Sequence, residues 1–289
     1  MNLTDYAAIR LLLERHGFRF SKSMGQNFLI DASVPYRIAE AAEIDRSCGV
    51  LEIGPGIGCL TEQLAERAGK VVSIELDRSL APVLKETLGE RDNVEIVFGD
   101  VMKQDLRALA EEKLPGLKKL VCANLPYNIT SPVLTALIRA GCFERICVMI
   151  QKEVAERICA APGSKSYGAF GLFVQWHCEP ELLFAVPPHC FVPQPKVTSA
   201  VVLLRRRLSP PCAVDDEELL FRIIRAAFNQ RRKTLPNALT AALPQLSKEE
   251  AEAILQNSGL DPKIRGEMLS LSDFAEISNE ISRRIIINL

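Results

Sequence analysis

The chain has 289 residues, of which 48% are hydrophobic and 25% are charged, and its formal net charge is −1. This composition excludes a disordered chain and supports one large folded domain plus a smaller one. It argues against a uniformly basic nucleic-acid binder, although it permits local basic patches. No apolar run approaches the ~20 residues of a membrane span, and residues 1–5 lack the features of a secretory signal. We therefore expect a soluble, cytoplasmic protein without membrane contact.

The nine cysteines are scattered and form no Cys-x-x-Cys pair. The His-Cys dipeptides at residues 177–178 and 189–190 match no common structural zinc spacing. Cys122 and Cys147 lie inside apolar runs, where a free thiol behaves as a small hydrophobic group. We expect reduced thiols and no metal site.

The first half of the chain has an alternating pattern of strands and helices. Residues 7–16 and 34–44 have apolar side chains at helical spacing, with a predicted loop at residues 22–29 between them. The predicted strands then cover residues 50–53, 71–75, 94–98, 120–124 and 146–150. The predicted helices that follow them cover residues 57–68, 80–88, 106–112, 132–140 and 154–160. This order indicates an α/β fold with a doubly wound, mostly parallel sheet and right-handed crossovers.

The pattern changes after residue 160. Residues 170–176, 181–186 and 197–204 are predicted as late strands, at least one of them antiparallel. The proline-rich residues 187–195 fit neither a helix nor a central strand. Residues 209–211, Ser-Pro-Pro, are predicted as a linker. The helices predicted beyond it cover residues 217–228, 236–242, 248–257 and 271–287. We therefore expect two domains, residues 1–208 and a small all-helical domain at residues 209–289.

A glycine-rich loop, Glu-Ile-Gly-Pro-Gly-Ile-Gly at residues 52–58, lies between the first strand of the sheet and a helix. Closely spaced glycines let a ligand approach backbone N–H groups. Cys59 stands where a dinucleotide fingerprint needs its third glycine, and no Walker lysine follows. Gly-x-Gly-x-Gly behind an acid is instead typical of S-adenosylmethionine loops, with an ordinary glycine turn as the alternative.

Two acids end the next two strands. Glu75 ends the second strand, where a carboxylate would accept hydrogen bonds from ribose hydroxyls. Asp100 follows the third, where it could accept from an adenine amino group. Each acid alone could be a helix N-cap or a surface group. Together at one edge of the sheet, they favour a Rossmann-like S-adenosylmethionine methyltransferase.

The sequence Asn124-Leu125-Pro126-Tyr127 follows a buried strand. The Asn124 side-chain oxygen and the Leu125 carbonyl could accept hydrogen bonds from the amino group of a base, which would localise its lone pair. Pro126 fixes the turn, and Tyr127 could stack on the base, worth ~1–3 kcal/mol. Methyl transfer from a sulfonium to such an amine needs neither a metal nor a general base. An ordinary turn at the end of a strand is the alternative.

Other residues could contact the substrate. Phe191, in the proline-rich segment, could cover the second face of the base, or it could be a hydrophobic plug under a loop. A paired base would have to be flipped out of its helix. Basic residues predicted to contact RNA are Lys22, Arg205, Arg206, Arg207, Arg231, Arg232 and Lys233. The alternative for the two basic runs is that they are solvated ends of a strand and a helix.

Long motifs across nearly the whole chain resemble the ribosomal RNA adenine dimethyltransferases, in particular their bacterial small-subunit branch. These motifs cover residues 25–29, 52–58, 124–129, 191–199, 226–235 and 261–265. Met24 and Cys59 stand where the family more often has Leu and Ala or Thr, and both changes are conservative. The resemblance implies dimethylation of N6 of two adjacent adenosines in a hairpin loop near the 3′ end of small-subunit RNA. It further implies action late in subunit assembly, on an immature particle, and we expect a monomer.

The resemblance also implies a set of cofactor contacts. Asn27 and Leu29 join Gly54, Glu75, Asp100 and Asn124 around the S-adenosylmethionine, the product being S-adenosylhomocysteine. We expect their neighbours Gln26, Gly56, Leu76 and Val101 to line the same site. The first domain would be catalytic, and the second would recognise RNA and the ribosome.

Three other functions are consistent with parts of the sequence. Large-subunit resistance methyltransferases share the catalytic domain, but the Arg231–Leu235 region resembles the small-subunit branch. A protein that checks subunit assembly without catalysis would not need the intact residues 124–127, although it could act in addition to the enzyme. Amine methylation of DNA or of protein glutamine uses a related Asn-Pro-Pro-Tyr sequence, which Leu125 and the helical second domain disfavour.

Overall fold

The computed structural model describes residues 1–18 and 26–287. Two compact units make up the chain. The first comprises Met1–Ala155 and Glu179–Arg206, and the second comprises Glu156–Cys178 and the chain from Arg207 onward. The catalytic and recognition domains expected at residues 1–208 and 209–289 stay functional predictions. The compact units differ from those ranges in residues 156–178 and 207–208, which belong to the second unit.

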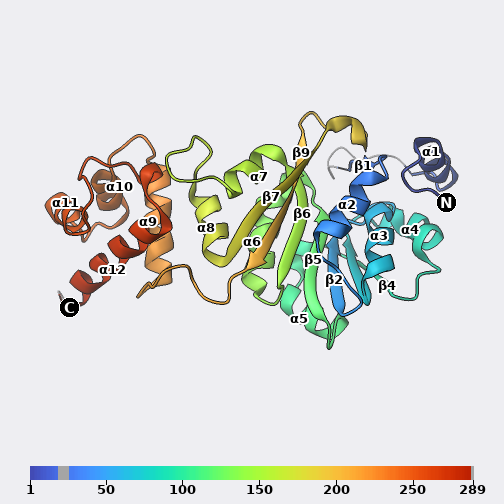
Figure 1. Cartoon of the computed structure of the whole chain (residues 1–289), viewed down its shortest axis with the longest axis horizontal. Coiled ribbons are helices and arrows are strands. Elements are labelled where there is room, and N and C mark those ends of the chain that lie inside the picture. The colour runs from blue at the N-terminus through green and yellow to red at the C-terminus, as the bar shows by residue number, and fades with distance from the viewer. Residues whose placement is uncertain (19–25, 288–289) are drawn as a thin grey trace. The chain divides into compact units, whose positions relative to one another are not determined.

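The first unit is built on a seven-stranded sheet with the order β4-β3-β2-β5-β6-β9-β7 (Figure 1). Its strands are β2 (Cys48–Ile53), β3 (Lys70–Glu75), β4 (Val94–Phe98), β5 (Lys118–Asn124), β6 (Arg145–Gln151), β7 (Cys178–Val186) and β9 (Ser199–Arg206). Strands β2 to β6 pair in parallel, whereas β9 runs antiparallel to β6. The predicted α/β class, with its late antiparallel strand, is therefore confirmed.

Helices cover the sheet and bury its apolar residues. They are α1 (Tyr6–Arg15), α2 (Ser33–Ala41), α3 (Cys59–Arg67), α4 (Ala81–Leu88), α5 (Leu106–Lys113), α6 (Thr130–Ala140) and α7 (Lys152–Ile158). Ile38 of α2, Leu64 of α3 and Leu84 of α4 share one buried cluster with Met149 of β6 and Leu203 of β9. Because alternate residues of a strand face opposite sides, the neighbours of these strand residues fill the other face of the sheet.

A pair of short strands lies outside the main sheet. β1 (Phe28–Leu29) pairs antiparallel with β8 (Phe191–Val192), which follows the 3-10 helix η5 (Pro188–Cys190). The Ile30 N–H extends this pairing by donating to the Cys190 carbonyl at 2.8 Å. The proline-rich segment is thus joined to the segment that contains residues 26–29.

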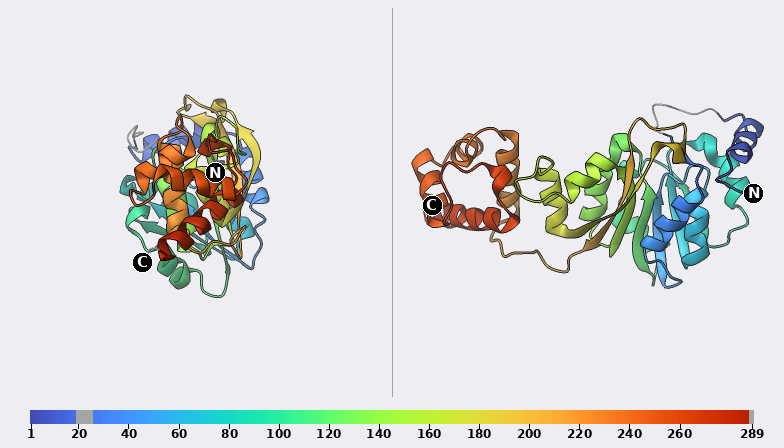
Figure 2. Two further views of the ribbon diagram at one scale, coloured as in Figure 1. Left: turned by 90° about the vertical axis from the view of Figure 1, so that its left-hand side faces the viewer. Right: turned by 45° about the horizontal axis from the view of Figure 1, so that its top comes forward.

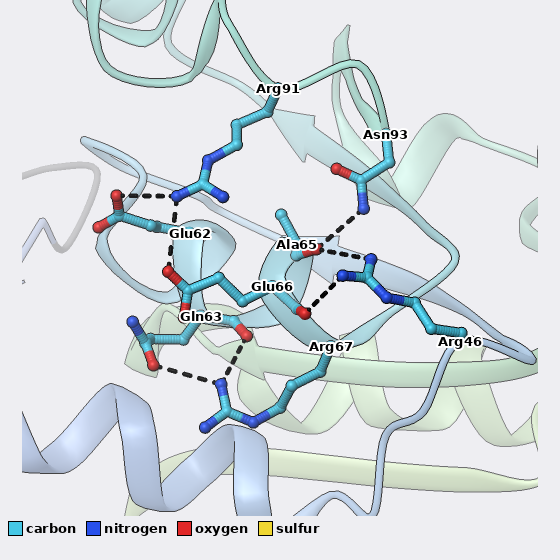
Figure 3. Close-up of polar contacts among 8 residues, drawn as sticks. All are labelled: Arg46, Glu62, Gln63, Ala65, Glu66, Arg67, Arg91 and Asn93. Carbon is cyan, nitrogen blue, oxygen red and sulfur yellow. Dashed lines mark hydrogen bonds and ion pairs between the residues drawn. The ribbon is translucent and has the colours of Figure 1, made fainter.

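Side chains from neighbouring loops hold the C-terminal end of α3 (Figure 3). Arg46 donates to the carbonyls of Glu66 at 2.9 Å and Ala68 at 2.8 Å, and Asn93 donates to Ala65 at 2.9 Å. The last carbonyls of a helix lack intrahelical partners, so these bonds act as a cap made by residues distant in sequence. They fix the helix that starts directly after Gly58.

The described residues of the second unit include five complete α-helices. They are α8 (Ala169–His177), α9 (Glu217–Asn229), α10 (Leu235–Ala242), α11 (Lys248–Asn257) and α12 (Leu271–Ile287). In the right-hand view of Figure 2 the orange and red helices surround a common centre. Trp176, Ile224 and Phe274 belong to its buried cluster. Asp216 caps α9, and Ser247 forms a capping box with Glu250 at α11.

The prediction of a strand at residues 170–176 is wrong, because this segment forms helix α8. Its aromatic and apolar residues have high β-propensity, but that propensity mainly reflects packing, which tertiary context can override. Phe173 contacts His177 one turn later, with ring centroids 4.8 Å apart. A Cβ at Gly171 would lie 2.4 Å from the Arg157 carbonyl oxygen, so only glycine allows this close approach of α8 to the preceding helix.

Candidate active site

A cavity of about 310 Å³ opens beyond the carboxyl ends of β2, β3, β4 and β5. Ligand sites of α/β sheets lie at this edge. All ten residues predicted to hold the cofactor line the cavity, namely Gln26, Asn27, Leu29, Gly54, Gly56, Glu75, Leu76, Asp100, Val101 and Asn124. The structure thus brings them together, and their binding role stays a prediction. Phe28 and Met102 also line the cavity, although sequence reasoning did not single them out.

The loop after β2 depends on its glycines. Gly54, Gly56 and Gly58 have φ values of +71°, +59° and +93°, a left-handed conformation that other residues rarely adopt. A Cβ at Gly54 would meet no atom within 4 Å, which shows open space beside the backbone at the cavity. A Cβ at Gly56 would approach the Phe28 ring to 3.0 Å. The loop therefore exposes backbone where a ligand can approach closely.

Glu75 and Asp100 lie at the ends of adjacent strands in the cavity wall. Glu75 is only 6% exposed, and its carboxylate accepts from the backbone N–H groups of Asp77 at 2.8 Å and Gly56 at 3.3 Å. Burial raises the pKa of Glu75 above its ordinary value. Asp100 accepts from the Met102 N–H at 2.9 Å, so it also caps a 3-10 turn. Gln26 donates to Asp77 at 2.8 Å and thereby connects the N-terminal segment to the end of β3.

Glu52, the acid that precedes the glycine loop, is 1% exposed. The hydroxyls of Thr61 and Ser73 both donate to its Oε2 atom, at 2.7 Å and 2.6 Å. Burial raises the pKa of Glu52 to about 7, and the two hydroxyls act in the opposite direction. The sequence indicated the acid but not its partners, which lie 9 and 21 residues away on α3 and β3.

The turn after β5 is fixed by hydrogen bonds at several points. Asn124 lies opposite Met149 in the sheet, and the Leu125 N–H donates to the Met149 carbonyl at 3.1 Å. The Thr130 hydroxyl donates to the Pro126 carbonyl at 3.1 Å. The Asn124 Nδ2 atom donates to the Asn27 carbonyl at 3.5 Å, which orients the side-chain amide.

Two acceptors in this turn have no donor within the described part of the chain. They are the Asn124 Oδ1 atom and the Leu125 carbonyl oxygen, and both residues line the cavity. No residue among 1–18 and 26–287 donates a hydrogen bond to either oxygen atom. A ligand with an N–H₂ group could therefore use both acceptors.

The two aromatic residues predicted to hold a base lie in different surroundings. Tyr127 lines the cavity, and its hydroxyl is hydrogen-bonded to the Ser199 hydroxyl at the start of β9. Burial raises the pKa of Tyr127. Phe191 is 1% exposed and belongs to the buried cluster of the first unit, and it is not part of the cavity wall. Its stacking role stays a prediction, which would require its side chain to move.

Three of the basic residues predicted to contact RNA end strand β9 or follow it. Arg205 forms an ion pair with Glu43, which Arg145 also contacts. The hydrogen bond from Arg205 is the main reason why the pKa of Glu43 is lowered to about 2. Arg206 is exposed, and Arg207 donates to the Gln175 carbonyl at 3.1 Å. Lys22 lies outside the described residues, as do Met24 and Gly25.

The second basic run lies in the second unit. Arg231 forms an ion pair with Glu267 and donates to the carbonyls of Ser164 at 3.4 Å and Lys165 at 3.0 Å. It therefore joins the segment before α8 to the segment before α12. Arg232 and Lys233 are exposed. Contact of these residues with RNA stays a prediction.

Within residues 1–18 and 26–287, every helix is too short or too polar to span a membrane. No group of three or more His, Cys, Asp or Glu side chains in those ranges is placed to hold a metal ion.

The doubly wound sheet, the late antiparallel strand and the glycine loop with acids at the next strand ends define a Rossmann-like methyltransferase. Comparison with known families agrees, since a model of the ribosomal RNA adenine dimethylase family matches residues 17–282. The chain belongs to this family and is an S-adenosylmethionine-dependent ribosomal RNA methyltransferase.

Relatives in two bacteria are similar along nearly their whole length. The ribosomal RNA small subunit methyltransferase A of Geobacillus kaustophilus is 48% identical over 94% of this chain and 94% of its own. The protein of the same name in Streptococcus thermophilus is 45% identical over 97% of this chain and 98% of its own.

Two solved structures share the fold. A dimethyladenosine transferase from Plasmodium falciparum has a TM-score of 0.76 at 27% identity, covering 89% of this chain and 98% of its own. The 23S rRNA methyltransferase ErmE has a TM-score of 0.69 at 28% identity, covering 88% of this chain and 99% of its own.

Proposed function

We propose that this enzyme dimethylates N6 of two adjacent adenosines in the 3′-terminal hairpin loop of small-subunit ribosomal RNA, late in assembly of the subunit. The names of the two bacterial relatives support a small-subunit target. The observation that carries the chemistry is the pair of acceptors at the cavity wall, Asn124 Oδ1 and the Leu125 carbonyl, which receive no donor from the described residues. An exocyclic amine has two N–H groups that match these two acceptors.

The residues of the cavity fit S-adenosylmethionine. The open space beside Gly54 would admit the part of the cofactor that approaches backbone, and Glu75 would accept from the ribose hydroxyls. Asp100, Leu76 and Val101 would surround the adenine. Bound in this way, S-adenosylmethionine supplies an electrophilic methyl group on a sulfonium.

The protein contributes mainly orientation. An adenine amine is a poor nucleophile because its lone pair is delocalised into the ring. Hydrogen bonds to Asn124 and Leu125 would favour a pyramidal nitrogen with the lone pair aimed at the methyl carbon. Tyr127 would stack on the base, and holding the reactants in line would supply most of the acceleration. The product ammonium would lose its proton to water.

The large-subunit alternative is supported by one observation, the structural similarity to ErmE at 28% identity. Identities of 45% and 48% to enzymes named for the small subunit favour the small-subunit target. The Arg232 and Lys233 side chains, which are exposed on the second unit, would contact phosphates of the small-subunit RNA. An additional role in checking assembly would be separate from the methyl transfer.

The test uses labelled S-adenosylmethionine and immature small subunits that lack the modification. We expect the wild-type chain to place four methyl groups on two adjacent adenosines and to leave large subunits unlabelled. Asn124→Ala should lower the rate by about a hundredfold or more, the scale of losing one precisely placed transition-state contact. Its affinity for S-adenosylhomocysteine, measured by calorimetry, should change far less. Normal cofactor binding by the wild type without labelling of small subunits would refute the proposed target.

A further inference from the structure

Tyr127 has a polar contact that its predicted stacking role does not use. Its hydroxyl shares a hydrogen bond of 2.5 Å with the hydroxyl of Ser199, 72 residues later in the chain. Ser199 is 0% exposed and is the first residue of β9. A phenylalanine would present the same aromatic face to a base, so stacking alone does not explain the tyrosine.

The sheet order explains what this hydrogen bond spans. Strand β6 lies between β5, which ends at Asn124, and β9, which starts at Ser199. Met149 of β6 is the partner of Asn124, and Gln151 of β6 is the partner of Ser199. The Tyr127 side chain therefore reaches from the turn after β5 past strand β6 to the first residue of β9.

Both ends of the turn are then fixed to the sheet. The Leu125 N–H bond to Met149 holds the beginning, and the Ser199 bond holds the tip of the Tyr127 side chain. Between them lie the Leu125 carbonyl and the Tyr127 ring, two of the groups that would contact the base. A buried hydroxyl without its partner costs free energy, so this contact restricts movement of the Tyr127 side chain about its Cα–Cβ bond.

We propose that Ser199 is a positioning residue for methyl transfer, which holds the Tyr127 side chain in place against the target base. This inference rests on the proposed function, because the base is the substrate assigned there. Ser199 itself would not touch the base. Burial raises the pKa of the Tyr127 hydroxyl above its ordinary value of 10, so the hydroxyl keeps its proton near neutral pH.

The experiment is a double-mutant cycle with Ser199→Ala, Tyr127→Phe and both together, assayed on immature small subunits well below the unfolding temperature. Each single variant should lower kcat by about ten- to a hundredfold, the range that misplacement of reacting groups can cost. KM for the particle and affinity for S-adenosylhomocysteine should stay within about threefold of wild type. The kcat of the double variant should match that of the slower single variant within about twofold, because either single substitution already removes the hydrogen bond between Tyr127 and Ser199.

Tyr167→Phe is the matched control. It removes another buried tyrosine hydroxyl bond, of 2.8 Å to the Leu269 carbonyl, in the second unit. It should lower the unfolding temperature and leave kcat unchanged. If Ser199→Ala behaves like this control, or if the losses of the two single variants multiply in the double variant, the inference is wrong. An inactive wild-type chain would instead refute the proposed function.

Discussion

The buried acid Glu52 predicts an unusual pH dependence of stability. Its carboxyl group is 1% exposed, and its pKa is raised from 4.5 to about 7 in the folded protein. Between these two values the unfolded chain releases a proton that the folded chain keeps. The free energy of unfolding therefore falls as pH rises through this window, and the loss is complete above the folded pKa.

The magnitude follows from the shift. One pKa unit corresponds to about 1.4 kcal/mol, so Glu52 should remove about 2–3 kcal/mol of stability between pH 5 and pH 8. The Glu52→Gln side chain is uncharged at every pH, and its carbonyl can accept both hydroxyl bonds, from Thr61 and Ser73. We expect its stability to equal that of the wild type near pH 5 and to exceed it by about 2–3 kcal/mol at pH 8.

The assay is urea unfolding of both proteins at intervals from pH 5 to pH 8, followed by circular dichroism. Glu75 also has a raised pKa and contributes to that of Glu52, so the difference between the two proteins reports Glu52 together with its interaction with Glu75. Glu43→Gln is the control, because the pKa of Glu43 is shifted the other way, to about 2, which lies below the range from pH 5 to pH 8. This variant should barely change how the free energy of unfolding depends on pH within that range. Parallel curves for wild type and Glu52→Gln would show that Glu52 stays ionised, and the reasoning from burial would be refuted.

Two further predictions concern side chains that connect distant segments. Asn93→Ala removes the hydrogen bonds that the Asn93 side chain donates to the carbonyls of Ala65 and Ala68. It should lower the free energy of unfolding of the first unit by about 1–2 kcal/mol, measured by the same urea titration. An unchanged free energy of unfolding would mean that water replaces these hydrogen bonds. Arg231→Ala should lower the unfolding temperature by a few degrees, whereas Arg232→Ala, at an exposed neighbour, should leave it within about 1 °C. Equal unfolding temperatures for these two variants in differential scanning fluorimetry would contradict a bridging role for Arg231.

Local patterns in the sequence were sufficient for most of the secondary structure and for much of the cavity wall. The predicted strands and helices of the first half all occur, because apolar runs bounded by glycine and polar residues are strong local signals. Seven of the ten predicted cofactor residues meet in one cavity because the carboxyl ends of parallel strands share one edge of the sheet. The other three, Gln26, Asn27 and Leu29, come from the segment around β1, which the family resemblance indicated. Residues 170–176 were predicted wrongly, since their composition suits a strand, whereas in the fold they form helix α8, which packs closely against Arg157 at Gly171.

Contacts between residues far apart in the chain were decided by the tertiary structure alone. Sequence marked Tyr127 as an aromatic face, but its bond to Ser199 exists only because β9 returns antiparallel beside β6. In the same way, folding placed Arg205 against Glu43 and buried Phe191 in the core. Periodicity and motifs depend on residues that are close together in the sequence, and they predict local structure. The partner of a side chain across the sheet depends instead on strand order and register, which no local pattern encodes.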